Sequence, residues 1–322
     1  MAKKSKAPLP YQPTRRRLAR WQEERRRRRI TLIVGAAVIV TILAIIGYGV
    51  YDTVIAPGRE RVATVGQQHL TVGDYETALR LLSAQQPSAK DVLEGLVNFE
   101  LIRQGADELG IEATQDEIME ELRNALTGEG EELTDEELLQ RYSQTLDYLG
   151  VSDEEFREGL ATQVLGKKIE EYLRGEVPEV GEVIPHVHLK VIPLTTAEQA
   201  QNVTARLEEG EDFASLAAQF GGGDTGWVPE GAMSLEIEEF AFNAQSGNVT
   251  QYFASSEGYS VVRVVEPAQD RPLADEDTRE QLQDAAYGHW LEVQRDQKVT
   301  WQIDEQRLQA IYQSLKQAQG EG

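Results

Sequence analysis

An uncharged apolar run, Ile30 to Tyr51, limits what the first part of this chain can fold into. Its 22 residues are enough to cross about 30 Å of hydrocarbon as a helix. Five consecutive arginines, Arg25 to Arg29, precede the run, and Asp52 follows it. Basic residues favour the cytoplasmic side of a membrane. We therefore predict a cytoplasmic tail at 1–29 and a single-pass transmembrane helix at 30–51 in the cell membrane, with all later domains extracytoplasmic.

A cleaved signal peptide is the alternative interpretation of the same segment. Its basic region and its apolar core are both longer than is typical, and Pro57 stands where cleavage would fall. We therefore favour an uncleaved membrane anchor.

The charge is divided unevenly along the chain. The net charge is −23, but residues 1–29 carry +10, which leaves −33 for the remaining residues. Such an acidic body would repel phosphates, so we expect no nucleic-acid partner. The chain has no cysteine, which excludes disulfides, thiolate metal sites and thiol nucleophiles.

Helix starts are legible in the region after the apolar run. Thr114, Thr134 and Ser152 each stand three residues before a glutamate, which is the pattern of a capping box. Apolar residues at helical spacing follow the third of these starts, and Pro178 ends that pattern. The region is therefore predicted to be mostly helical.

Glycines form a literal G-x-G-x-x-G at Gly221, Gly223 and Gly226. A dinucleotide-binding turn needs a strand before these glycines and a helix after them. Here the preceding residues have helical spacing, and Pro229 follows too soon for a phosphate-binding helix. We expect a tight turn into a sheet, in which glycine permits positive φ, and no cofactor.

Four blocks of sequence resemble the parvulin-type peptidyl-prolyl isomerase domain, in the order of that family. They read "RLEEGEDFASLAAQF", "GGDTGWVPEGAM", "EEFAFNAQSGNVT" and "SSEGYSVVRVVE", and the resemblance covers 183–267. In addition, "VATVGQQHLTVGDYETALRLL" from Val62 is similar to the start of the chaperone domain in the SurA/PrsA-like extracytoplasmic foldases.

This resemblance implies an α+β fold. It predicts a helical SurA-N-like chaperone domain at 59–182, an inserted parvulin-like rotamase domain at 183–267, and C-terminal helices at 268–322 that complete the helical domain. Two apolar stripes support those last helices: Leu282, Ala286, Trp290 and Val293, then Leu308, Ile311, Tyr312 and Leu315. The resemblance also implies that the chain binds unfolded or proline-containing polypeptide segments.

The resemblance implies two groove histidines and a polar loop residue in an active isomerase. The last-strand histidine is replaced here by Ser260, and the loop that carries the polar residue is deleted between Phe220 and Gly221. Depending on register, the first histidine position is Val191 or His188. The family's histidine faces the groove, and strand alternation gives Val191 the apolar face, so we favour Val191.

The groove positions that remain are mainly apolar. Met233, Ile237 and Phe242 match the family's proline-cradling positions, Thr225 stands where leucine is usual, and we also assign Ser255 to the groove. We therefore predict a chaperone that binds polypeptide and has no confidently assigned catalytic residue. Two alternatives stay open: an active prolyl isomerase that uses His188 with Ser260, and a non-enzymatic assembly factor for one membrane partner.

Histidines also raise the question of a metal site. His186 and His188 are two residues apart on a predicted strand, so both would point to one face, and His69 and His289 lie elsewhere in the chain. No further ligand is positioned by the sequence. We expect solvent-facing histidines and no metal.

Overall fold

The computed structural model describes residues 57–128, 133–250, 252–255, 258–318 and 320. The predicted tail at 1–29 and the predicted transmembrane helix at 30–51 lie outside these residues. Among the helices that the structure does describe, none is long and apolar enough to cross a membrane. The chain from Arg61 to Gly322 forms one compact unit.

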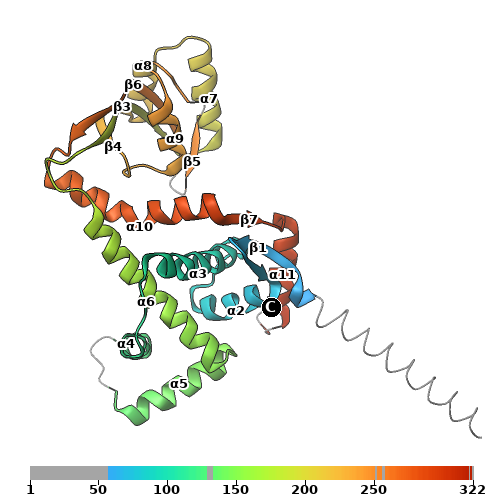
Figure 1. The fold of residues 1–322 in the computed structure, drawn as a ribbon. Coiled ribbons are helices and arrows are strands. Elements are labelled where there is room, and N and C mark those ends of the chain that lie inside the picture. Colours follow the sequence, from blue (N-terminus) through green and yellow to red (C-terminus); the bar gives the residue numbers. More distant parts are fainter. Residues whose placement is uncertain (1–56, 129–132, 251, 256–257, 319, 321–322) are drawn as a thin grey trace, which may run out of the picture. The chain divides into compact units, whose positions relative to one another are not determined.

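The described residues form an α+β fold with two antiparallel sheets (Figure 1). In chain order the elements are η2 (Pro57–Arg59), β1 (Arg61–Val65), β2 (Gln68–Thr71), α2 (Val72–Leu82), η3 (Ser83–Gln85), α3 (Ala89–Leu109), α4 (Gln115–Leu126), α5 (Asp135–Leu149), α6 (Asp153–Glu176), β3 (Val183–Leu194), α7 (Ala197–Glu208), α8 (Phe213–Phe220), β4 (Gly223–Pro229), α9 (Leu235–Asn243), β5 (Phe253–Ser255), β6 (Gly258–Pro272), α10 (Glu276–Lys298), β7 (Val299–Trp301) and α11 (Glu305–Ala318).

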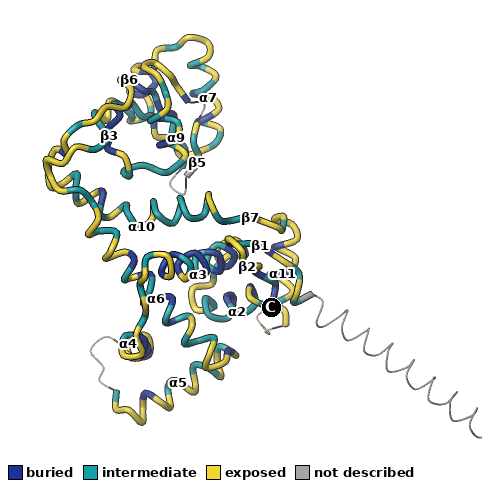
Figure 2. The backbone as a smooth tube through the Cα atoms, in the orientation of Figure 1, coloured by how far each residue is buried: buried dark blue, intermediate teal, exposed yellow. Residues whose placement is uncertain are grey.

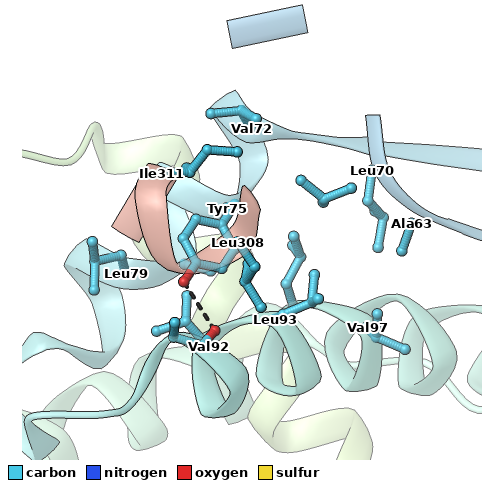
Figure 3. Packing of buried hydrophobic residues seen from close by; sticks show 14 of the residues in the cluster. Ala63, Leu70, Val72, Tyr75, Leu79, Val92, Leu93, Val97, Leu308 and Ile311 are labelled. Atoms are coloured by element: carbon cyan, nitrogen blue, oxygen red, sulfur yellow. Dashed lines mark hydrogen bonds between the residues drawn. The ribbon is translucent and has the colours of Figure 1, made fainter. Parts of the chain in front are cut away.

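The first sheet joins the two ends of the described chain. Its strand order is β2-β1-β7, so the late strand β7 pairs with β1, with Ala63 opposite Trp301. Helices α2, α3 and α11 pack with it around one apolar core (Figure 3). Tyr75 is fully buried in this core, and its hydroxyl donates a hydrogen bond to the carbonyl of Ala89 at 2.9 Å.

Helices α4, α5 and α6 extend the helical part. Among the helices of this part, α3 is the most buried. Helix α5 buries only Leu138 and Tyr142 and is exposed along most of its length (Figure 2). A separate apolar cluster joins α3 and α6 to α10 through Ile102, Ile169 and Trp290. Helices that are separated in the sequence by residues 183–272 thus share one apolar cluster.

The second sheet has the strand order β4-β3-β6-β5. One face packs against α7 and α8, through a cluster that includes Ile192, Val261 and Phe213. The opposite face packs against α9, through a cluster that includes Leu189 and Ala241. Strand alternation supplies both faces, because neighbouring residues of a strand point in opposite directions.

Strand β6 is longer than the sequence pattern suggests. It continues through Pro267 to Pro272, where we expected the chain to have left the sheet. Beyond Glu266 the strand pairs with the first part of β3 and with no other described strand. Proline is tolerated there, because a strand with one free edge does not need every N–H for the ladder.

Candidate functional site: the groove of the second sheet

Strand β3 presents different chemistry on its two faces. Val187 and Leu189 are fully buried in the cluster that packs against α9, and Val191 packs against the same cluster. His188 and Lys190 alternate with them and are only partly buried. The side of β3 that carries the position assigned to the groove is therefore apolar and packs into this cluster.

Helix α9 and the loop before it cover this apolar side of β3. Met233 precedes the helix, and Ile237 and Phe242 belong to it, and all three pack against the cluster that holds Val191. The structure thus brings together four of the positions that we assigned to the groove.

The start of α9 is held by a buried carboxylate. The side chain of Glu238 is almost completely buried, and it accepts a hydrogen bond from the backbone N–H of Gly231 at 2.5 Å. Burial raises the pKa of Glu238, and the nearby His289 opposes this effect. The sequence analysis did not identify Glu238. No local signal singled it out, because α9 also carries Glu236 and Glu239.

Ser260 belongs to β6, opposite Phe253 of β5 and Pro193 of β3. It is two residues before Val262, which is buried in the groove cluster, so strand alternation directs Ser260 to the same face. Phe253 packs against this cluster as well. We had not assigned Phe253 to the site, although it falls in the short strand that leads to Ser255.

His188 lies outside the apolar cluster and is bonded to acidic side chains. Its Nε2 is 2.7 Å from Oδ1 of Asp224, and its Nδ1 is 3.3 Å from Oε1 of Glu266. The hydrogen bond with Asp224, helped by Glu266, raises the pKa of His188. Two carboxylate acceptors favour the imidazolium form, in which both ring nitrogens donate.

Thr225 and Ser255 are the remaining assigned groove positions. The Thr225 hydroxyl donates to the carbonyl of Leu189 at 2.9 Å, so it is engaged with the backbone of β3. Ser255 ends β5, where it pairs with Gly258.

The glycine-rich stretch forms a turn from α8 into β4, as predicted. Gly221 and Gly226 have φ of 77° and 73°, in the region that favours glycine. Gly222 is required for a different reason. A Cβ atom there would stand 2.2 Å from the carbonyl oxygen of Val191, so a side chain would collide with β3.

The histidines do not gather around one point. His69 bonds Thr64, His289 lies 3.6 Å from Glu238, and no group of three or more metal-ligating side chains suited to a metal ion occurs among the described residues. The expectation of a solvent-facing His186 was wrong. This side chain is 4% exposed, with Nδ1 2.9 Å from the carbonyl of Ile184, because bulges around 186–189 interrupt the alternation of burial.

Comparison with known families adds two matches to this geometry. The SurA-like N-terminal domain family matches residues 23–170, and the PPIC-type PPIase domain family matches residues 194–266. The second match contains the α8–β4 turn, α9, β5 and part of β6, and it begins at the last residue of β3. The chain belongs to the SurA/PrsA-like parvulin foldases.

Curated relatives of this SurA/PrsA-like chain are foldases by name. It is 30% identical over 213 residues to the foldase protein PrsA of Halalkalibacterium halodurans, covering 60% of this chain and 61% of the relative. It is 30% identical over 190 residues to the PrsA of Caldanaerobacter subterraneus subsp. tengcongensis, covering 54% and 56%. The matches therefore span less than two thirds of these relatives' lengths.

A solved structure of the peptidylprolyl isomerase PrsA from Bacillus anthracis is also similar. The sequence identity is 18%, 72% of this chain and 99% of that chain are covered, and the TM-score is 0.29. The two domain matches and the sequence relatives carry the family assignment.

Proposed function

We propose that this SurA/PrsA-like chain is a membrane-anchored extracytoplasmic foldase that binds unfolded polypeptide segments, with a parvulin-like groove that accelerates prolyl isomerisation little. The observation that supports the last point is the packing of Val191. This valine packs with Met233 and Ile237, whereas the ring of His188 is bonded to Asp224 and Glu266 outside that cluster.

The physical argument concerns the transition state. Rotation about an X–Pro bond has a barrier of about 18–20 kcal/mol. A groove lowers this barrier only where it binds the twisted bond better than the planar one. An apolar wall excludes water and holds the proline ring, but Val191 offers no polar group, and Ser260 stands where the family has a second histidine. The groove is thus suited to binding.

A protease-coupled assay on an Ala-Pro peptide tests the catalytic part. The full-length chain in detergent is expected to accelerate isomerisation by less than about tenfold at micromolar concentration, since loss of a single polar group in other enzymes costs about 10²–10³ in rate. His188→Ala should leave any residual rate unchanged. A large acceleration that His188→Ala abolishes would instead establish the active isomerase that uses His188.

Delayed aggregation of a denatured client, followed by light scattering, tests the chaperone part.

The anchor can be tested because the chain has no cysteine. A single cysteine at Glu305 should react with a membrane-impermeant maleimide in intact cells, whereas one at Lys4 should react only after lysis. The opposite labelling would contradict the proposed topology.

A further inference from the structure

A cavity lies in the helical part, away from the second sheet. It has a volume of about 260 Å³ and is lined by residues of β2, α2, α3 and α6. Leu70, Ala78 and Leu96 are buried and contribute apolar lining from the main core. Leu81 and Phe99 line the same cavity and are only partly buried, so apolar surface is accessible there.

Acidic side chains outnumber basic ones around this cavity. Four carboxylates and one guanidinium line it: Asp74, Glu100, Glu155, Glu158 and Arg103. Asp74 and Glu155 belong to the capping boxes at the starts of α2 and α6. The buried Glu100 accepts hydrogen bonds from Arg103 and Gln104.

Glu158 differs from these three acids. Its side chain is exposed, and no described residue donates a hydrogen bond to its carboxylate, although the Arg103 guanidinium is near enough to interact with its charge. The cavity therefore combines apolar lining, an excess of negative charge and one carboxylate that is available to a ligand. Gln68, also in the lining, adds an amide.

The cavity continues into a polar hollow. This second hollow, of about 580 Å³, shares Gln68, Glu100 and Arg103 with the first, and it extends to Gln104 and Lys298. Two adjoining hollows along α3 suit an extended segment with backbone amides better than a compact small molecule.

We propose that this cavity binds a lysine or arginine side chain of an unfolded polypeptide, with apolar residues on either side of it. The proposal rests on the proposed function and specifies the class of segment that the helical part selects. Lysine and arginine have an apolar stem and a cationic head. The stem would contact Leu81 and Phe99, and the head would bind Glu158. An acidic segment would be repelled, as it would be by the chain's strongly acidic body.

Peptide binding to the full-length chain in detergent tests this charge selection. The probes are three proline-free, fluorescein-labelled peptides with lysine, norleucine or glutamate at one central position between leucines, and fluorescence anisotropy at low salt is the readout. We expect the lysine peptide to bind at least tenfold more tightly than the norleucine peptide, and the glutamate peptide to bind most weakly. Equal affinity for the lysine and norleucine peptides would overturn the proposal.

Two variants on α6 test whether Glu158 provides the selection. Glu158→Gln should bring the affinity for the lysine peptide close to that for the norleucine peptide. Glu171→Gln, at another exposed acidic position of α6, should keep the preference of the wild type. A Glu158→Gln variant with an unchanged preference would overturn the assignment.

A pair of glycine substitutions tests the cavity itself. Gly159 lines the cavity, and a Cβ atom there would be in ordinary contact with Leu81, at 3.7 Å. The longer side chain of Gly159→Met would then fill the cavity and weaken lysine-peptide binding at least tenfold. Gly175→Met is the matched control, because it lies on the same helix with nothing within 4 Å of its Cβ position. Both changes raise helix propensity.

The client assay separates failure of this proposal from failure of the proposed function. A wild-type chain that delays client aggregation, and a Gly159→Met variant that does so equally well and binds the lysine peptide normally, would overturn only the cavity proposal. A wild-type chain that neither binds the peptides nor delays aggregation would overturn both.

Discussion

At the scale of single residues, His188 is the side chain whose role depends most on its neighbours. Its pKa is raised because Asp224 accepts its hydrogen bond. A group whose pKa is higher in the folded state contributes full stability below its unfolded pKa, about 6.5 for histidine, and loses that contribution as the pH rises through the folded pKa. This ion pair should therefore stabilise the second sheet in mildly acidic solution and contribute less above neutrality.

Asp224→Asn should lower the pKa of His188, as measured by NMR titration of the imidazole ring protons. The expected direction follows from removing the carboxylate that contributes most to the shift. Glu198→Gln, at an exposed position of α7, should leave the titration unchanged. If Asp224→Asn left the His188 pKa as it was, the contact between the two side chains would not persist in solution.

Gly222 gives a second prediction at this scale. Gly222→Ala would place a Cβ atom 2.2 Å from the carbonyl oxygen of Val191 and 2.9 Å from the Cα of Ile192, both of them backbone atoms of a central strand. We expect a loss of roughly 1–3 kcal/mol in the free energy of unfolding, measured with denaturant. Gly223→Ala is the control, since nothing lies within 4 Å of its Cβ position. Equal stability of the two variants would contradict the close approach.

Single positions also show what sequence could and could not reveal about the site. Alternation along β3 assigned Val191 to the apolar face, because each strand residue points opposite to the next. The same rule failed for His186, since bulges shift the pairing of β3 with β6. No local pattern reveals such bulges. The burial of Glu238 was also missed, because it depends on packing between distant segments.

At the scale of elements, helix caps explain why the helical part was predictable. The capping boxes at Thr114, Thr134 and Ser152 are confirmed, each with a hydrogen bond in both directions. Two further boxes, at Thr71 and Ser88, were missed. In these the reciprocal acid is an aspartate, which the usual pattern of glutamate or glutamine does not include.

Ser152→Ala should destabilise the chain by about 1 kcal/mol, because it leaves an N–H group at the start of α6 without its partner. Ser152→Thr keeps the hydroxyl and should cost less, and chemical denaturation would measure both. Helix α6 packs against α3 and α10 through Ile169, so a less stable α6 should lower the stability of the whole helical part. A Ser152→Ala variant as stable as the wild type would show that solvent replaces this cap.

At the scale of the whole molecule, the main core needs both ends of the described chain. Leu308, Ile311 and Tyr312 of α11 belong to the cluster built by β1, β2, α2 and α3. The Tyr312 hydroxyl donates a hydrogen bond to the carbonyl of Pro87 at 2.6 Å. All strands of the second sheet lie between these two residues in the sequence. Residues of the first helices therefore cannot complete their core until α11 has been synthesised.

Truncation and substitution test this dependence together. Removal of everything after Lys298 deletes β7 and α11, and should expose Val92, Leu93 and Val97 in α3, which we expect to cause aggregation or rapid proteolysis. In the full chain, Ile311→Ala should cost about 2–5 kcal/mol of stability, whereas Gln309→Ala, at an exposed position of α11, should cost less than about 0.5 kcal/mol. A fragment ending at Lys298 with native-like hydrogen exchange in α3 would mean that the core closes without its C-terminal helix. The second sheet has two apolar clusters of its own, so a substitution that weakens α11 should destabilise α3 and leave this sheet intact. Hydrogen exchange after Ile311→Ala should therefore rise in α3 before it rises in β3.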